Sequence, residues 1–466
     1  MSIDIQVREA DLYFIAPLRI INYSSFEAGL LKAGWVRPSD VPFDLYSNDA
    51  IYDSAASFLG MTGKEKLSRV TPGVCFVAPA KNDSATVVGR FKESFSGGNC
   101  ELSFSNRKHK DEESPVWADE IVLGEILRVH VSPDRSTGLF VIHFRRPQLK
   151  GKSRIPPISI RSIESTNYWL HKTDDQAPTV FVNGTTVAGC NTIVDYANLL
   201  CGLAPGIAET LYPGRLLTAT YMQIVRPESY SDGDAASFDR EVDTRIMHIS
   251  QCKGAAYEIV GTETLRTHHL FDNIRVGVSS EGFCGGFIVK KGADNERYMS
   301  KSSTTFLKSY LSVFLESVML DFMTLRMLEG EDVDNLKDQD SLFQNLKLGM
   351  HMPVSRYTHL QQLKKIMLSV FSVPEKIRTV ASYLDDMRKQ EEQRNSDRIN
   401  LLLGFMGVGQ VIFAILQIIG LERVFGEGLP ASPWMKAASI ACVAVFFFFS
   451  LVIVVRVLPS LWRRRK

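Results

Sequence analysis

The first 301 residues are dominated by short segments in which apolar and polar side chains alternate. Such alternation is typical of β-strands, because successive side chains point to opposite faces of a sheet. Clusters of Gly, Pro, Asp and Ser separate the segments and indicate turns. Two segments have helical periodicity instead, at residues 23–35 and 190–204. The predicted strands cover residues 85–95, 120–131, 138–146, 178–187, 216–225 and 283–291.

This pattern predicts a β-rich α+β domain over residues 1–301. A Pro- and Lys-rich stretch at 145–157 is a candidate boundary, near residue 150, between two subdomains. No segment of this domain matches a nucleotide-binding loop, a hydrolase nucleophile motif, a kinase motif or a zinc motif. We therefore expect no catalytic residues, no enzyme activity and no bound cofactor, and the sequence leaves any metal site unknown.

The periodicity becomes helical near residue 302. The segment 302–330 begins with serines and threonines, which favour helix N-termini, and ends at Gly330. Charged residues recur along it, so a buried or oligomer-facing helix is favoured over a membrane span. Further helices are predicted over about 341–371 and from Glu375 onwards. Residues 302–398 are therefore interpreted as a helical stalk region.

Two long apolar segments follow the stalk region. Residues 399–421 contain no charged side chain, and residues 434–455 contain only Lys436. About twenty helical residues cross the hydrocarbon core of a bilayer, so both segments are long enough. The sequence therefore predicts two transmembrane helices, 399–421 and 434–457, followed by a basic tail at 458–466.

The charges around this hairpin predict its orientation. Basic residues precede the first span and follow the second, whereas the connecting turn at 422–433 has one basic and two acidic residues. The positive-inside rule then places both termini in the cytoplasm of a protein that crosses the inner (plasma) membrane twice. The N-terminus also lacks the pattern of a secretory signal. The predicted interface anchors are Trp434, Trp462, Arg463, Arg464, Arg465 and Lys466. The basic tail either binds anionic lipid or only fixes topology.

Two glutamines make the first span unusual. Gln410 and Gln417 are seven residues apart, so they lie on one face of a helix. Lipid cannot satisfy their amides. They are expected either to hydrogen-bond between helices of an oligomer or to line a water-filled pore, and the sequence does not separate these alternatives. The candidate pore-lining residues are Asn400, Leu403, Gly407, Gln410, Ala414 and Gln417.

Composition excludes some other functions. The chain has 466 residues and a formal net charge of +1, which argues against a nucleic-acid-binding protein. Its seven cysteines are scattered, and no two are spaced as C-x-x-C. We interpret them as reduced thiols rather than as zinc ligands or disulfides.

The C-terminal part of the chain resembles the CorA-like superfamily of two-span divalent-cation transporters. The residues that carry the resemblance are the stalk at 375–400, the two spans and the basic end "LWRRRK" at 461–466. The resemblance covers residues 302–466 and implies a cytosolic domain, a pentamer and a pore lined by the first span. The Gly-Met-Asn signature of that family is absent, because residues 418–428 read "IIGLERVFGEG". The resemblance therefore supports architecture more than substrate.

These observations lead to one expected function and two alternatives. The expected function is a homo-oligomeric, CorA-like ion channel or cation transporter whose pore is gated by the cytoplasmic domain. A divalent cation is then the transported or regulatory ion, and the lipid bilayer and further copies of the chain are the partners. The first alternative is a membrane effector, as in bacterial defence, whose cytoplasmic domain senses an unknown ligand or protein. The second is an anchored receptor or scaffold.

Overall fold

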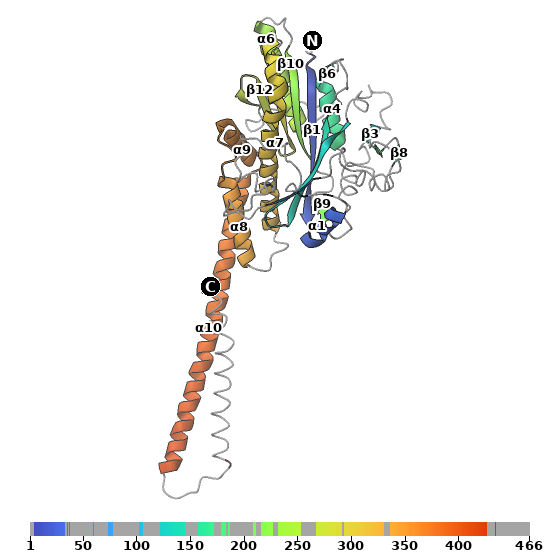
Figure 1. Ribbon diagram of the computed structural model, residues 1–466. Helices are drawn as coiled ribbons and strands as arrows, with labels where there is room; N and C mark the ends of the chain where they lie inside the picture. The colour runs from blue at the N-terminus through green and yellow to red at the C-terminus, as the bar shows by residue number, and fades with distance from the viewer. Residues whose placement is uncertain are drawn as a thin grey trace. The chain divides into compact units, whose positions relative to one another are not determined.

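The structure, a computed structural model, contains a β-sheet region followed by a series of helices (Figure 1). The strand predicted at 85–95, the helix predicted at 190–204 and all of the second predicted span except Trp434 lie outside the described residues. The structure describes residues 4–32, 35, 37, 59, 73–77, 102–105, 122–145, 157–171, 179–182, 185–186, 208–210, 216–226, 232–252, 267–290, 293–329, 336–425 and 434.

The main sheet has ten strands and is built around β1 (Gln6–Ile20). The other nine are β2 (Val74–Val77), β4 (Val122–Val131), β5 (Thr137–Arg145), β6 (Ile158–Ser159), β9 (Ala208–Thr210), β10 (Leu217–Arg226), β11 (His268–Phe271), β12 (Ile274–Val278) and β13 (Gly282–Lys290). The order along the sheet is β11-β12-β13-β10-β1-β5-β4-β2, and the short strands β6 and β9 pair with the two ends of β1. β10 and β13 are parallel, and the other pairs are antiparallel.

Most strand predictions that fall on described residues are confirmed. The segments at 120–131, 138–146, 216–225 and 283–291 correspond to β4, β5, β10 and β13. The segment at 178–187 forms β7 (Thr179–Val182) and β8 (Thr185–Thr186), which form a second sheet with β3 (Leu102–Ser105). The helix predicted at 23–35 is confirmed as α1 (Tyr23–Lys32).

The central strand β1 is not among the predicted strands. Its side chains are buried from Leu12 to Leu18, so both faces of the strand are covered. A strand buried on both faces reads as a continuous apolar run and loses the alternation by which exposed strands are recognised. Pro17 also argues against a central strand, because proline cannot donate a hydrogen bond to a ladder.

Helices cover both faces of the main sheet. α4 (Ile160–His171) and α6 (Asp232–Ser250) lie on one face, and α7 (Ala293–Glu329) lies on the other. Phe283 of β13 points to α7, where its ring centroid is 5.8 Å from that of Phe314. Gly286, on the opposite face of β13, lies against α6, and a Cβ atom there would lie 2.6 Å from Cδ1 of Ile246. Glycine at this position therefore permits the close packing of α6 on the sheet.

The main sheet does not divide near residue 150. β1 pairs with β5, which precedes that residue, and with β10, which follows it. The strands on the two sides of the candidate boundary therefore share one sheet. By its internal contacts the chain separates into a unit Met1–Ser382 and a unit Tyr383–Lys466.

The long helix α7 is buried along its centre. From Tyr310 to Thr324 every residue is buried, including the charged Glu316 and Asp321. This confirms the interpretation of the segment as a buried helix. Its predicted start at residue 302 is wrong, because α7 begins at Ala293. Serine and threonine are only mildly unfavourable inside helices, so the run at 302–305 does not define the helix start.

The helix predicted over 341–371 is also wrong in its extent. It is two helices, α8 (Leu336–His351) and α9 (Thr358–Val370). Pro353 lies in the break between them, where its ring and its missing N–H prevent helix continuation. The last helix, α10 (Val373–Phe425), runs for 53 residues without a break, as predicted. Its Pro374 lies in the first turn, where proline is tolerated.

Candidate functional site

α10 carries an apolar segment whose side chains are exposed. Within Val373–Ala414, an 18-residue window has a mean hydropathy of 1.2, and none of that window is buried. Leu401, Phe405 and Val411 each expose 60% or more of their surface. By length and composition this helix can cross a membrane, and it is the one helix with that property in the part of the chain that the structure describes.

The candidate pore-lining residues that the structure describes lie on this helix. Leu403 and Gln410 share one face, and Asn400, Gly407 and Ala414 form a neighbouring row. All five are exposed. Gln417 also belongs to α10, but its side chain lies outside the described residues.

Gly407, which belongs to one of these rows, and Gly404 beside it have open space around them. A Cβ atom added at Gly404 or Gly407 would meet no described atom within 4 Å. Packing against the described residues therefore does not explain these glycines, in contrast to Gly286 of β13. Small residues on an apolar helix allow another helix to approach closely.

The predicted membrane-interface anchors are only partly described. Trp434 is 84% exposed. Trp462, Arg463, Arg464, Arg465 and Lys466 lie outside the described residues.

The start of α10 is a sharp junction with α9. Phe371 ends α9 in a right-handed conformation, and Ser372 then has a φ of 54°. The N–H of Ser372 donates to the carbonyl of Ser369, and its own carbonyl accepts from the N–H of Lys376. A left-handed residue ends a helix and turns the chain, so Ser372 fixes where α9 stops and α10 starts.

Two ion pairs attach this junction to α7. Nζ of Lys364 in α9 lies 2.7 Å from Oε1 of Glu316, and both side chains are buried. The same ammonium group donates to the carbonyls of Gly349 and Met352, at 2.8 and 2.9 Å. Burial raises the pKa of Glu316, although Lys364 opposes the shift. The second pair joins Nζ of Lys376 in α10 to Oδ1 of Asp321, at 2.5 Å.

An aromatic contact connects the same junction to the sheet. The ring centroid of Phe314 in α7 lies 5.8 Å from that of Phe283 in β13 and 6.2 Å from that of Phe371. Phe314 is fully buried. One side chain of α7 therefore contacts both the sheet and the residue at which α9 ends.

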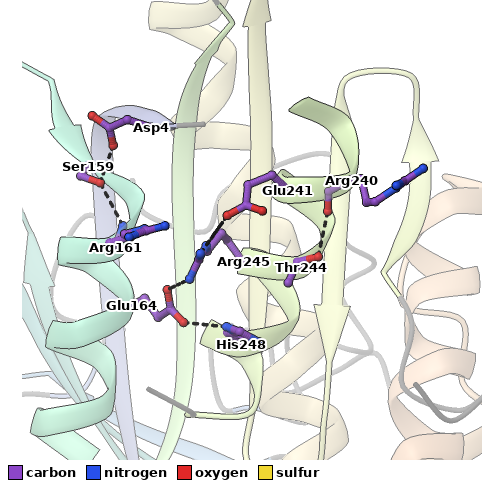
Figure 2. A network of polar contacts seen from close by, with 9 residues as sticks. All are labelled: Asp4, Ser159, Arg161, Glu164, Arg240, Glu241, Thr244, Arg245 and His248. Carbon is purple, nitrogen blue, oxygen red and sulfur yellow. Dashed lines mark hydrogen bonds and ion pairs between the residues drawn. The ribbon is translucent and has the colours of Figure 1, made fainter. Parts of the chain in front are cut away.

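A buried polar network lies on the other face of the sheet. Figure 2 shows Glu164 of α4 pointing at Arg245 and His248 of α6. Nη1 of Arg245 donates to Oε2 of Glu164 at 2.9 Å, and Nδ1 of His248 donates to Oε1 at 2.7 Å. Burial alone would lower the pKa of Arg245, but Glu164 and Glu241 together raise it. These charge-assisted bonds hold α4 against α6.

Sequence reasoning did not identify the ion pairs or the polar network as features of the fold. A signal for the ion pairs was present, because Glu316 and Asp321 interrupt an apolar helix and a buried charge needs a partner. No comparable signal singles out Glu164 within α4. Among the described residues, no group of three or more His, Cys, Asp or Glu side chains is arranged to hold a metal ion.

Comparison with known proteins adds no assignment. No protein-family model, no curated protein and no solved structure matches this chain.

Proposed function

We propose that this chain is an ion-conducting membrane protein that works as a homo-oligomer, with residues 399–421 lining the pore. The observation that carries the proposal is α10 itself. The helix begins among buried residues of the folded unit, such as Val373 and Ile377, and continues into an apolar segment whose described side chains are exposed. An exposed apolar helix of this length is costly in water and is accommodated by a bilayer.

The polar positions of α10 favour a pore over a simple anchor. An anchor needs no amide in its apolar segment, yet Gln410 lies on the exposed surface of the helix. In a ring of identical helices, this amide would meet either a neighbouring subunit or water. Two spans of one chain cannot enclose an aqueous path, so conduction requires several copies. The CorA-like resemblance of the C-terminal part suggests five, with both termini in the cytoplasm and a cation as the conducted ion.

The contacts of α7 supply a route by which the folded unit would control the pore. α7 packs on the sheet through Phe314 and reaches the α9–α10 junction through Phe371, Glu316 and Asp321. A movement of the sheet against α7 would therefore act on the first turn of α10. According to this proposal, the β-rich domain senses a signal and α10 transmits it to the pore.

The stoichiometry of the full chain in detergent is the first test. Light scattering coupled to size-exclusion chromatography is expected to give a single oligomer, with a pentamer as the specific expectation. A monomer or dimer would contradict the proposal and leave an anchored receptor or scaffold as the better assignment.

Ion flux from liposomes that contain the full chain is the second test. Gln410→Leu and Gln417→Leu are expected to leave the oligomer intact and to change cation flux. Ile412→Leu is the matched control, because position 412 lies on the opposite side of α10 and the variant should behave as the wild type. Loss of assembly in the glutamine variants would assign the amides to helix association. Unchanged assembly and flux would refute the proposed pore face. Flux that appears only with an added ligand would favour the effector alternative.

A further inference from the structure

A second polar feature lies far along the chain from α10, in the turn between β4 and β5. Arg135 in this turn has a φ of 63°, a left-handed conformation that side-chain-bearing residues adopt at a cost. Hydrogen bonds fix the turn around it. The N–H of Arg135 donates to the carbonyl of Ser132 at 3.0 Å, and the hydroxyls of Ser132 and Ser136 both donate to the carboxylate of Asp134. These hydrogen bonds hold the backbone of Arg135 in its left-handed conformation.

One nitrogen of the Arg135 guanidinium, Nη1, is buried without a hydrogen-bond acceptor. The guanidinium carbon lies 5.3 Å from the ring centroid of Tyr23, the first residue of α1. Among the described residues, no carboxylate lies within ion-pair distance of this guanidinium, although the charge of Asp134 acts on it and opposes the lowering of its pKa. A buried guanidinium nitrogen without an acceptor is costly unless a ligand supplies one.

A second arginine, Arg37, lies near Tyr23 and Arg135. Arg135 lies over the ring of Tyr23, whose hydroxyl donates to Oε1 of Glu27 at 3.3 Å, and Arg37 pairs with the same oxygen. The two guanidinium groups therefore lie on either side of Tyr23 and Glu27. Burial first, and Arg37 in addition, lower the pKa of Arg135. Arg37 pairs with Glu27 of α1, and its guanidinium carbon lies 6.0 Å from the ring centroid of Phe76. Its side chain is 48% exposed, so the pair of arginines is open to solvent on this side.

We propose that Arg135 and Arg37 form a binding site for a phosphoryl group. Two neighbouring guanidiniums favour an anion that carries more than one negative charge and several acceptor oxygens, which a phosphate monoester offers and a carboxylate does not. The planar fork of arginine donates to two such oxygens at once. The phosphoryl group belongs either to a soluble phosphorylated compound or to a lipid headgroup. This site is independent of the proposed pore, and it would give the folded unit a signal to sense.

The test measures thermal unfolding of the full chain in neutral detergent, with inorganic phosphate added at constant ionic strength. A ligand that binds only the folded state raises the unfolding midpoint as its concentration rises. Wild type is expected to show this rise with phosphate but not with chloride. Arg135→Gly should fold at least as well without phosphate, because glycine adopts the left-handed conformation freely, and should lose the response. Arg135→Lys keeps the charge but not the fork, and its affinity is expected to fall about tenfold.

Two further arms complete the experiment. Arg161→Gln removes an exposed arginine from α4 and is the matched control, so its phosphate response should equal that of the wild type. The same variants in nanodiscs with and without phosphatidic acid distinguish the two sources of the phosphoryl group. A response only to the lipid assigns a headgroup site, and a response to phosphate assigns a soluble ligand. No response in either arm, or a response that Arg135→Gly retains, would overturn the proposal, whatever the flux measurements show.

Discussion

At the scale of single residues, backbone conformation identifies the positions that are under strain. Among the described residues, only Arg135, Cys252 and Ser372 combine a side chain with a positive φ. Ser372 lies at the junction between α9 and α10, where the direction of the long helix is set. Its side chain is exposed, so the positive φ is required by the change of chain direction between α9 and α10 and not by side-chain packing.

Ser372→Gly is therefore expected to stabilise the protein. Glycine reaches a left-handed conformation without the clash that a Cβ atom makes, and helix ends of this kind usually carry glycine. The expected gain in the free energy of unfolding is about 0.5–1 kcal/mol, measured by chemical denaturation.

Ser369→Gly is the matched control for that variant. It makes the same change three residues earlier, at an exposed position inside α9, and should cost about 0.5 kcal/mol. If both variants are destabilised equally, the strain assigned to Ser372 is wrong.

At the scale of elements, the buried pair of Glu316 and Lys364 joins α7 to α9. Lys364→Met leaves a buried carboxylate without its cation, which costs about 3–5 kcal/mol. Lys365→Met, at the exposed neighbouring position, is expected to be nearly neutral. Denaturation of the two variants beside the wild type measures this difference.

The same pair gives a prediction for pH. Burial raises the pKa of Glu316 above its ordinary value, so the folded state binds this proton more tightly than the unfolded state does. The contribution of such a group to stability is fully present below its unfolded pKa and is lost as the pH rises through its folded pKa. Removing Lys364 raises that pKa further. The destabilisation by Lys364→Met should therefore be smaller at about pH 5 than at about pH 8. An equal cost at both pH values, or the same pH dependence in a Glu316→Gln/Lys364→Met double variant, would contradict this account.

The elements also show which sequence signals are sufficient. α10 was predictable because no proline or glycine interrupts its charged part and its apolar part contains no charged residue. β13 was predictable from its β-branched and aromatic residues. β1 was not, because burial on both faces removes the alternation, and the break at Pro353 shows that one proline outweighs an otherwise helical pattern.

At the scale of the whole molecule, the pairing of distant strands could not be predicted. Leu12 is paired with residues of β5 and β10, and no local sequence pattern predicts which strands will pair with β1. The candidate site likewise has features that could be predicted from the sequence and features that could not. The amides of the apolar helix are visible in the sequence, whereas the ion pairs of α7 and the arginine pair at Arg135 and Arg37 depend on how distant segments pack.

The two compact units lead to a prediction for the full chain. A chain that ends at Arg398 keeps the folded unit and the charged part of α10 but lacks the apolar segment. It is expected to remain in the supernatant when membranes are pelleted, whereas the full chain should pellet and need detergent for release. A control with Ser396→Lys in the full chain changes charge only in the polar part of α10 and should still pellet. A full chain that stays in the supernatant would contradict membrane association.

The central position of β1 has a consequence for synthesis on the ribosome. Its partner β10 follows about two hundred residues later in the chain. At ordinary rates of translation, one edge of β1 therefore has no paired strand for roughly 10–40 s. An unpaired apolar strand edge promotes aggregation during this interval, so we expect chaperones to bind the nascent chain. The last strand of the sheet, β13, is nevertheless complete about a hundred residues before the apolar part of α10 is made. The domain can therefore close its sheet before the apolar segment of α10 leaves the ribosome.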